Sequence, residues 1–443
     1  MLQTIKNALK VKEIRKKLLF TLAMLVVIRI GSQIPLPGID QAQLEEILNK
    51  TLGAARDSGA FGFFDAITGG SFTSMSILAL NINPYITSSI IMQLLTIAIP
   101  KLEEMQRDGE EGRKKIVTIT RYLTVGLALV QSIGMVFGFR GIFTEFNAFT
   151  VITCIAALTA GSAFLMWIGE QITEYGVGNG ISIVLTINII SRLPQDIGGL
   201  YEKFIKGKAP ATAILAALII IAVFIAMVVL VIILNDAVRS IPVQYAKKMQ
   251  GHKMVGGSSS NIPLKVNTSG VIPIIFAQSL ITLPILITSF VSKNGATGVW
   301  AEILKYFSSN NWCRFNAAQI RYSAGLLVYI ALVIFFAYFY TSITFNPLLV
   351  SDNLKRQGGF IPGIRPGKPT SDYLNNVLNY IVFIGAIGLI IVCVLPYIFS
   401  GVFNAEVSVT GTSLIIIVSV VLETLKQIES MMLVRNYKGF LEN

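Results

Sequence analysis

The sequence is poor in charged residues. Asp, Glu, Lys and Arg make up 14% of its 443 residues, whereas they make up about 25% of an average soluble domain. In their place, uncharged apolar runs recur along the chain, and several approach the roughly 20 residues that a helix needs to cross the hydrocarbon core of a bilayer. This composition excludes a soluble enzyme and a disordered chain, and it predicts an all-α polytopic membrane protein.

Cysteine and histidine are scarcer still. The three cysteines, Cys154, Cys313 and Cys393, form no spaced pair, and His252 is the only histidine. A disulfide scaffold or a zinc site built from Cys and His ligands is therefore not expected, and we predict neither a metal nor a cofactor. The glycine-rich segment 176–180 lacks the lysine of a phosphate-binding loop and joins two apolar runs, so it favours a tight turn over nucleotide binding.

Ionisable side chains are missing from the middle of the apolar runs. Each Asp and Glu lies at the end of a run or in a loop. Arg29, the one basic residue inside a run, is near its outer end, where its side chain can reach the membrane surface. Ion-coupled transporters and intramembrane proteases need ionisable or catalytic groups at depth. The sequence therefore disfavours both classes, and we expect a protein that is not an enzyme.

Ten apolar windows predict ten transmembrane helices. Lysine and arginine are concentrated in the loops on the side of the N-terminus, which the positive-inside rule identifies as the cytoplasm. An even number of spans returns the chain to that side, so both termini are predicted to be cytoplasmic. The windows cover approximately residues 18–36, 73–98, 118–138, 151–169, 181–193, 213–234, 271–291, 322–346, 376–396 and 410–427.

Ten spans divide into two halves of five, and an odd number per half gives the halves opposite orientations. The second and seventh spans open similarly, with Asn83-Pro84-Tyr85-Ile86 and Ile272-Pro273-Ile274-Ile275. Inverted repeats of this kind place a functional site near the middle of the membrane, between the halves; the alternative is that proline is simply common in membrane helices. The predicted organisation is a cytoplasmic segment 1–17, an N-terminal half 18–193, a C-terminal half 213–427 and a cytoplasmic tail 428–443.

Two long cytoplasmic loops, 236–270 and 347–375, are basic. The first contains a strand-like stretch at 241–245, and the second contains a turn, 362–367, that is rich in Pro and Gly and presents Arg365. Cations fixed in this way suit a polyanionic or acidic partner, such as ribosomal RNA or an acidic motor protein; charge that only sets the topology is the alternative. The candidate docking residues are Arg239, Lys247, Lys248, His252, Lys253, Arg365 and Lys368.

Short motifs recur in order along nearly the whole chain, and together they resemble the SecY family, the pore subunits of the Sec protein-translocation channel. Each motif alone is weak, but their number and order are specific. They are Ile34–Gly38, Asn83–Thr87, Asp108–Lys115, Trp167–Glu174, Gly178–Ser182, Tyr245–Lys248, Leu264–Asn267, Gly270–Pro273, Phe345–Pro347, Pro362–Gly367 and Gly411–Leu414.

The resemblance implies an hourglass-shaped central pore between the two inverted halves, closed at its waist by a ring of aliphatic side chains. Such a ring offers a sliding polypeptide no fixed hydrogen-bond partner and can exclude ions by dewetting. Leu185 stands where the family more often has isoleucine, which keeps the chemistry of the position. The implied ring residues are Ile82, Ile86, Leu185, Ile275 and Ile416.

The resemblance also implies a plug and a lateral gate. The plug is a short segment at about 61–70 that closes the pore from outside, and the gate opens sideways between spans two and three and spans seven and eight. The implied plug residues are Phe61, Phe63, Phe64, Ile67, Gly69 and Gly70, and the implied gate residues are Thr87, Ser88, Gln131 and Gln278.

The function implied is that of a passive protein-conducting channel in a bacterial-type cell (inner) membrane. It would export unfolded secretory polypeptides and release transmembrane segments sideways into the lipid bilayer. A docked ribosome or a SecA motor ATPase would supply the energy, and small SecE-like and SecG-like membrane subunits would complete the assembly. Two other classes remain alternatives: a secondary transporter, which predicts a buried ionisable or polar substrate cluster, and a structural membrane scaffold, which predicts no pore.

Overall fold

The structure is a computed structural model. It describes residues 9–39, 68–72, 74–143, 146–206, 210–245, 248–250, 253–255, 259–291, 299–308, 312–313, 320–403 and 411–438.

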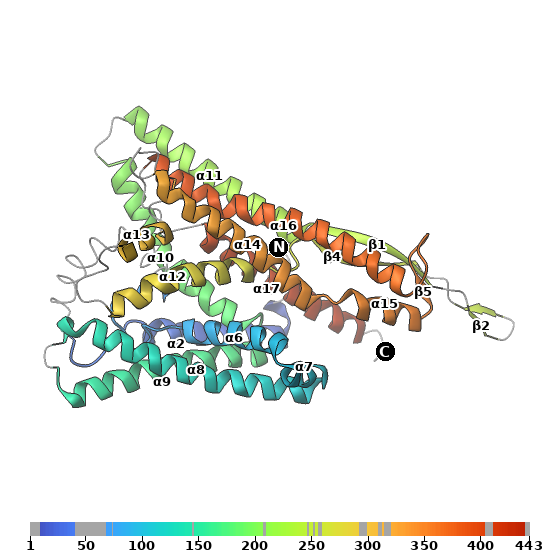
Figure 1. The fold of residues 1–443 in the computed structure, drawn as a ribbon, viewed down its shortest axis with the longest axis horizontal. Helices are drawn as coiled ribbons and strands as arrows, with labels where there is room; N and C mark the ends of the chain where they lie inside the picture. The colour runs from blue at the N-terminus through green and yellow to red at the C-terminus, as the bar shows by residue number, and fades with distance from the viewer. Residues whose placement is uncertain are drawn as a thin grey trace.

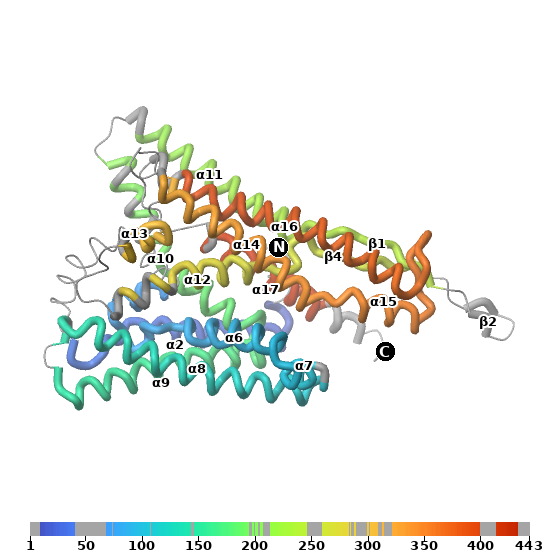
Figure 2. Tube along the Cα trace, in the orientation of Figure 1, coloured from blue at the N-terminus to red at the C-terminus, as the bar shows by residue number. Residues whose placement is uncertain are grey.

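A long helix lies in each of the ten predicted windows within these residues, and the helices form two groups (Figures 1 and 2). The N-terminal group contains α2 (Lys12–Gly31), α6 (Asn83–Ala98), α8 (Glu110–Gly138), α9 (Ala148–Tyr175) and α10 (Gly180–Phe204). The C-terminal group contains α11 (Pro210–Asp236), α12 (Ile272–Val291), α14 (Ala324–Thr344), α16 (Lys368–Phe403) and α17 (Gly411–Lys438).

Helices pack mainly within their own group. In the first group α9 contacts α2, α8 and α10, and α6 contacts α8; in the second, α16 contacts α11, α14 and α17, and α12 contacts α14. The two groups meet where α10 contacts α17 and where α12 contacts α8. The chain is therefore built as two helical halves with a junction between them.

The first helix ends earlier and the second begins later than predicted, because the apolar windows included turns. Helix α2 ends at Gly31, and α6 begins only at Asn83, with Pro84 in its first turn. The intervening segments pair with each other: the Leu36 amide donates to the Met75 carbonyl at 3.0 Å, and the Ile77 amide donates to the Ile34 carbonyl at 3.0 Å. These turns are apolar, so hydropathy alone does not separate them from the helix.

By length and composition, five helices in the described part of the chain could cross a membrane, or six if α6 and α7 (Pro100–Arg107), which meet at a bend of 106°, form one broken span. The most apolar of the five is Ala213–Asp236 of α11, of which only 11% is buried in the protein. In α10 and α12 the apolar helix is shorter, over Gly180–Pro194 and Ile272–Thr282. The helices that reach the junction between the halves are therefore less uniformly apolar than α11.

The two long basic loops fold together at one end of the molecule (Figure 1). They form an antiparallel sheet in the order β4-β1-β5, which confirms the predicted strand at 241–245. The strands are β1 (Val238–Tyr245), β4 (Ser259–Lys265) and β5 (Gly359–Phe360), and beside them lie the hairpin of β2 (Lys248–Gln250) and β3 (Lys253–Val255) and the helix α15 (Pro347–Arg356).

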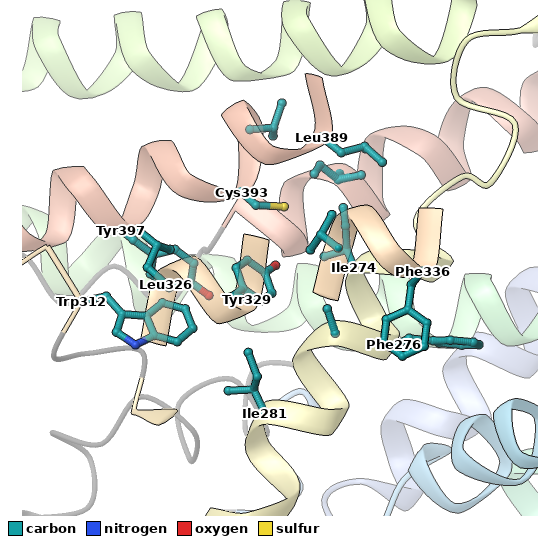
Figure 3. Close-up of a cluster of buried hydrophobic side chains, with 14 of the residues drawn as sticks. Ile274, Phe276, Ile281, Trp312, Leu326, Tyr329, Phe336, Leu389, Cys393 and Tyr397 are labelled. Atoms are coloured by element: carbon teal, nitrogen blue, oxygen red, sulfur yellow. The ribbon is translucent and has the colours of Figure 1, made fainter. Parts of the chain in front are cut away.

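The opposite end carries a short helix, α13 (Val299–Phe307), and a 3-10 turn, η3 (Ile320–Ser323). Trp312 fastens this region to the C-terminal half. Its side chain is 1% exposed, and its Nε1 donates to the Tyr306 carbonyl at 2.9 Å. Figure 3 shows Trp312 beside Leu326 and Tyr329 of α14, in an apolar cluster that also includes residues of α12 and α16.

Candidate functional site

A single apolar cluster occupies the junction between the two halves. Its buried members include Ile82, Leu185 and Ile416, which are 0%, 5% and 3% exposed, and the half-buried Ile86 and Ile275 pack against them. These five residues come from α6 and its N-cap, α10, α12 and α17. The structure therefore brings all five predicted ring positions into one cluster.

The position of Ile82 is fixed by the turn that precedes α6. Asn81 has a positive φ of 53°, and its side-chain oxygen accepts from the Ile82 amide at 2.7 Å. The Asn81 carbonyl in turn accepts from the Ser162 hydroxyl of α9 at 3.0 Å. A side chain at Gly161 would place its Cβ 2.3 Å from the Ile77 carbonyl oxygen. The start of α6 is thus held against α9 at close range.

Leu185 is positioned by the glycine-rich segment, which forms the turn between α9 and α10. Asn179 caps α10, accepting from the amides of Ile181 and Ser182 at 3.1 and 3.4 Å. A Cβ at Gly180 would lie 1.9 Å from the Gly169 carbonyl oxygen, so only glycine allows this approach. The segment therefore determines where α10 begins along α9, and so where Leu185 lies.

The predicted gate residues lie along α6, α8 and α12 but differ in burial. Ser88 and Gln278 are 0% and 1% exposed, while Thr87 and Gln131 are half-buried. The Ser88 hydroxyl is satisfied by the Pro84 carbonyl at 2.7 Å. Neither polar atom of the Gln278 amide has a hydrogen-bond partner among the residues that the structure describes. A buried amide without a partner costs about 1–3 kcal/mol of stability, which an apolar side chain at this position of α12 would not.

The predicted plug residues Phe61, Phe63, Phe64 and Ile67 lie outside the described residues. Gly69 and Gly70 are described, and both have positive φ, of 63° and 83°. A Cβ at Gly69 would lie 2.8 Å from both the Asn188 carbonyl oxygen and the Ser191 hydroxyl of α10. Gly69, at the end of the predicted plug, therefore lies directly against α10, whereas a Cβ at Gly70 would meet nothing within 4 Å.

Arg29, which the sequence places near the outer end of the first span, has a polar partner within the protein. Its guanidinium donates to the Asn188 side-chain oxygen of α10, with 3.5 Å between the heavy atoms. A Cβ at Gly69 would lie 3.0 Å from the same guanidinium. The small glycine leaves room for the cation to find a polar partner inside the protein, so Arg29 connects α2, α10 and the glycine pair.

The docking candidates that the structure describes lie on the sheet end. Arg239 on β1 and Arg365 and Lys368 beside β5 are exposed. The turn that presents Arg365 is fixed by positive φ at Gly363 and Gly367 and by the Thr370 hydroxyl, which donates to the Arg365 carbonyl at 2.8 Å. Lys248 and Lys253 belong to the β2–β3 hairpin, while Lys247 and His252 lie outside the described residues.

The family model named SecY matches residues 76–425. The chain belongs to the SecY family. The SecY protein of Streptomyces scabiei, named protein translocase subunit SecY, is 43% identical to it over the full length of both chains. Because SecY proteins are translocase subunits, this chain is a channel-family protein and not an enzyme, and it is a multi-pass protein of the bacterial inner membrane.

Solved structures confirm the all-α SecY fold. The chain resembles the structure of a protein-conducting channel with a TM-score of 0.61, at 20% identity, over 95% of this chain and 93% of the other. It also resembles Sec61 in the canine ribosome-channel complex from the endoplasmic reticulum, with a TM-score of 0.60 at 18% identity, over 95% of this chain and 93% of the other.

Two features of the site region were not foreseen from the sequence. Asn235, Asn267 and Ser419 form a hydrogen-bonded chain near the waist, and Arg29 contacts Asn188. Both features join residues far apart in the sequence through polar side chains that have no characteristic spacing. The Leu264–Asn267 motif contained one of these residues, but nothing in the motif indicated its partners.

Proposed function

We propose that the chain is the pore-forming subunit of a protein translocase and that the cluster around Ile82, Ile86, Leu185, Ile275 and Ile416 is the closed constriction of its pore. The observation that carries this proposal is the meeting of the five side chains from both halves in one apolar cluster. A waist made only of flexible aliphatic groups lets a polypeptide of any sequence slide past, and it excludes water and ions when the polypeptide is absent.

The seam between α6 and α8 on one side and α12 on the other serves as the lateral gate. A transmembrane segment inside the pore would leave through it and partition into lipid according to its hydrophobicity. The unpartnered amide of Gln278 supports this role, because a seam that retains an unsatisfied group opens at a smaller free-energy cost than a fully satisfied one.

The basic sheet end is the docking face for the partner that drives transport, either a ribosome or a SecA motor. Its exposed cations, Arg239, Arg365 and Lys368, are held by an ordered sheet and a rigid turn, which suits a polyanionic or acidic surface. Sec61 is a relative of this fold in a ribosome-channel complex. SecE-like and SecG-like subunits would complete the channel in the membrane.

Both chain termini lie on the cytoplasmic side in this proposal. The start of α2 and the end of α17 meet in one small cluster, where Ile14 packs with Ile428 and with Val177 of the turn between α9 and α10. The two terminal helices therefore end on the same side of the molecule. The excess of lysine and arginine in the loops of that side supports its assignment as cytoplasmic.

The proposed constriction is tested by measuring ion leak through the full channel in lipid bilayers, with its partner subunits present. We expect Ile86→Asn and Ile275→Asn to raise the resting conductance or to relax the selection of signal sequences, because a polar group stabilises water in the gap. The matched control is Ile221→Asn on the exposed face of α11, where the side chain is 56% exposed. Equal leak in all three variants, or none in the first two, would contradict the assignment.

A further inference from the structure

Strand β4 of the docking sheet continues almost directly into the gate helix α12. The sheet ladder extends one residue past β4, where the Val266 amide donates to the Ala237 carbonyl at 2.9 Å. Asn267 follows, and the chain then turns at Gly270, which has a φ of 63°, before α12 begins at Ile272. Any displacement of the β1–β4 pair therefore acts on the start of α12 through a short connection that contains Asn267.

Asn267 is joined to α11 by a side-chain hydrogen bond, and through that residue of α11 to α17. Its Nδ2 donates to Oδ1 of Asn235 at 3.0 Å, and Nδ2 of Asn235 donates to the hydroxyl of Ser419 at 2.7 Å. Asn235 is in the last turn of α11, and Ser419 is on α17. We call these three residues the asparagine clasp. It ties the start of the gate helix to two helices of the same half.

The asparagine clasp lies close to two of the five waist residues. Ser419 is three residues after Ile416 on α17, so the two side chains lie on one face of that helix. Ile275 is in the first turn of α12, and its amide donates to the Val271 carbonyl at 3.2 Å. The clasp therefore ties the connection that leads into α12, which carries Ile275, to α17, which carries Ile416.

The clasp is buried but incompletely satisfied. Asn267 is only 8% exposed, and its Oδ1 has no hydrogen-bond partner among the described residues. A buried acceptor without a partner favours any rearrangement that gives it one. A second link between α11 and α17, the ion pair of Asp236 with Lys426 at 2.6 Å, is about half exposed and does not include the start of α12.

We propose that Asn235, Asn267 and Ser419 are positioning residues that keep the waist closed at rest, and that a partner docking on the β1–β4 pair releases them and frees α12 to move. The inference rests on the proposed function, since it assigns a trigger to the same waist. The clasp is neutral, so docking has to break only hydrogen bonds and does not have to separate buried charges, which is the costlier step.

The test uses the full channel with its partner subunits in lipid bilayers. Asn267→Ala and Ser419→Ala are expected to raise the resting conductance about fivefold, the population shift that follows the loss of one net hydrogen bond from the closed state. By linkage, both variants should bind the partner no more weakly than the parent and up to about fivefold more tightly, because docking has one hydrogen bond fewer to break. Ser419→Thr retains the hydroxyl and should restore the resting value. Lys426→Gln, which removes the second link between α11 and α17, is the matched control and should leak no more than the parent.

A reversible cross-link tests the release step separately. In a chain without other cysteines, Asn235→Cys and Asn267→Cys are joined by a short bis-methanethiosulfonate. Each cysteine thiolate forms a disulfide with the reagent and displaces methanesulfinate, and a reducing thiol cleaves both disulfides again. The cross-linked channel should bind its partner but fail to transport, and cleavage should restore transport. Transport that is unaffected by the cross-link would overturn the release step, whatever the conductance of the alanine variants.

Failure of the clasp is distinguishable from failure of the proposed pore. If Ile275→Asn leaks in the same assay while Asn267→Ala and Ser419→Ala do not, the pore assignment stands and the clasp is overturned. If Ile275→Asn does not leak either, the pore assignment fails, and the clasp proposal fails too because it rests on that assignment. An equal rise in Lys426→Gln would also overturn the clasp, because the effect would then be a general loosening of α11 against α17.

Discussion

Contacts within the N-terminal half differ in kind from contacts across the seam to the C-terminal half. Within the half, backbones approach closely at Gly161 and Gly180, and the Arg121 guanidinium of α8 donates to the Glu170 carboxylate of α9 at 2.8 Å. Across the seam, Ile90 of α6 packs on the apolar cluster of the C-terminal half. On α12 the buried amide of Gln278 has no hydrogen-bond partner in the described part of the chain. The difference between the two regions is what we expect of a rigid half beside the proposed lateral gate.

The largest expected effect comes from disturbing the close packing of α9 against α10 in the N-terminal half. Gly180→Ala places a methyl group 1.9 Å from the Gly169 carbonyl oxygen, so α9 and α10 have to separate. We expect a loss of about 3 kcal/mol of stability, at the upper end for an overpacked site, visible as a lower thermal unfolding midpoint. The control is Gly126→Ala on α8, where a methyl group meets nothing within 4 Å. An equal loss in both variants would contradict the rigid packing.

Closing the seam more firmly should have the next largest effect. Gln278→Leu replaces a buried amide that lacks partners with an apolar group of similar size, which should stabilise the closed seam by about 1–3 kcal/mol. Segments of marginal hydrophobicity should then integrate into the membrane less often, as scored by glycosylation or protease protection of a test segment. The half-buried Gln131→Leu should change integration less. An increase in integration with Gln278→Leu would contradict the interpretation of the seam.

A smaller effect is expected from the ion pair that joins α8 to α9. Arg121 is about half exposed, so its removal in Arg121→Gln should cost only about 0.5–1 kcal/mol. The loss should appear in thermal unfolding and should shrink as salt is raised. Lys115→Gln removes an ion pair on the surface of the same helix, with Glu111 at 3.6 Å, and should cost less.

The smallest effect concerns the outer end of the C-terminal half. Lys305 and Tyr322 both donate hydrogen bonds to the Glu302 carboxylate, and they hold its pKa below the usual range. The stabilisation is complete above the unfolded pKa of about 4.3 and is lost as the pH falls through the lower folded pKa. The hydrogen-exchange protection factors of α13, which are corrected for the intrinsic dependence of exchange on pH, should therefore fall in acid. In Glu302→Gln this pH dependence should disappear, and its persistence would contradict the assignment to Glu302.

The sequence predicted the elements that depend on local composition. Hydropathy located a helix in each of the ten windows, and strand-like composition located β1. Hydropathy predicted the starts of the spans less accurately. It assigned the apolar turns over residues 74–81 to the same span as α6. Their actual structure depends on backbone pairing with residues 34–36, which hydropathy does not detect. The pairing of β1 with β5 was likewise not predictable, since it joins two loops about a hundred residues apart.

The candidate site was predicted only in part. The ring positions came from the family motifs, and the structure brings them into one cluster. The contact of Arg29 with Asn188 and the asparagine clasp were missed, because each depends on side chains that meet only after the helices have packed. A polar residue near a helix end is common in membrane proteins, so no pattern in the sequence distinguishes Asn235 or Ser419 from other polar residues.

The most direct test of the central claim is to cross-link a stalled secretory polypeptide to single cysteines in the full channel. Cysteine at Ile82, Ile275 or Ile416 should each react with the same short stretch of the stalled polypeptide, because all three side chains belong to the one apolar cluster that we propose as the pore waist. Cysteine at Ile221, on the exposed face of α11, should not react. Reaction at Ile221 with none at the three waist positions would show that the polypeptide does not pass between the two halves.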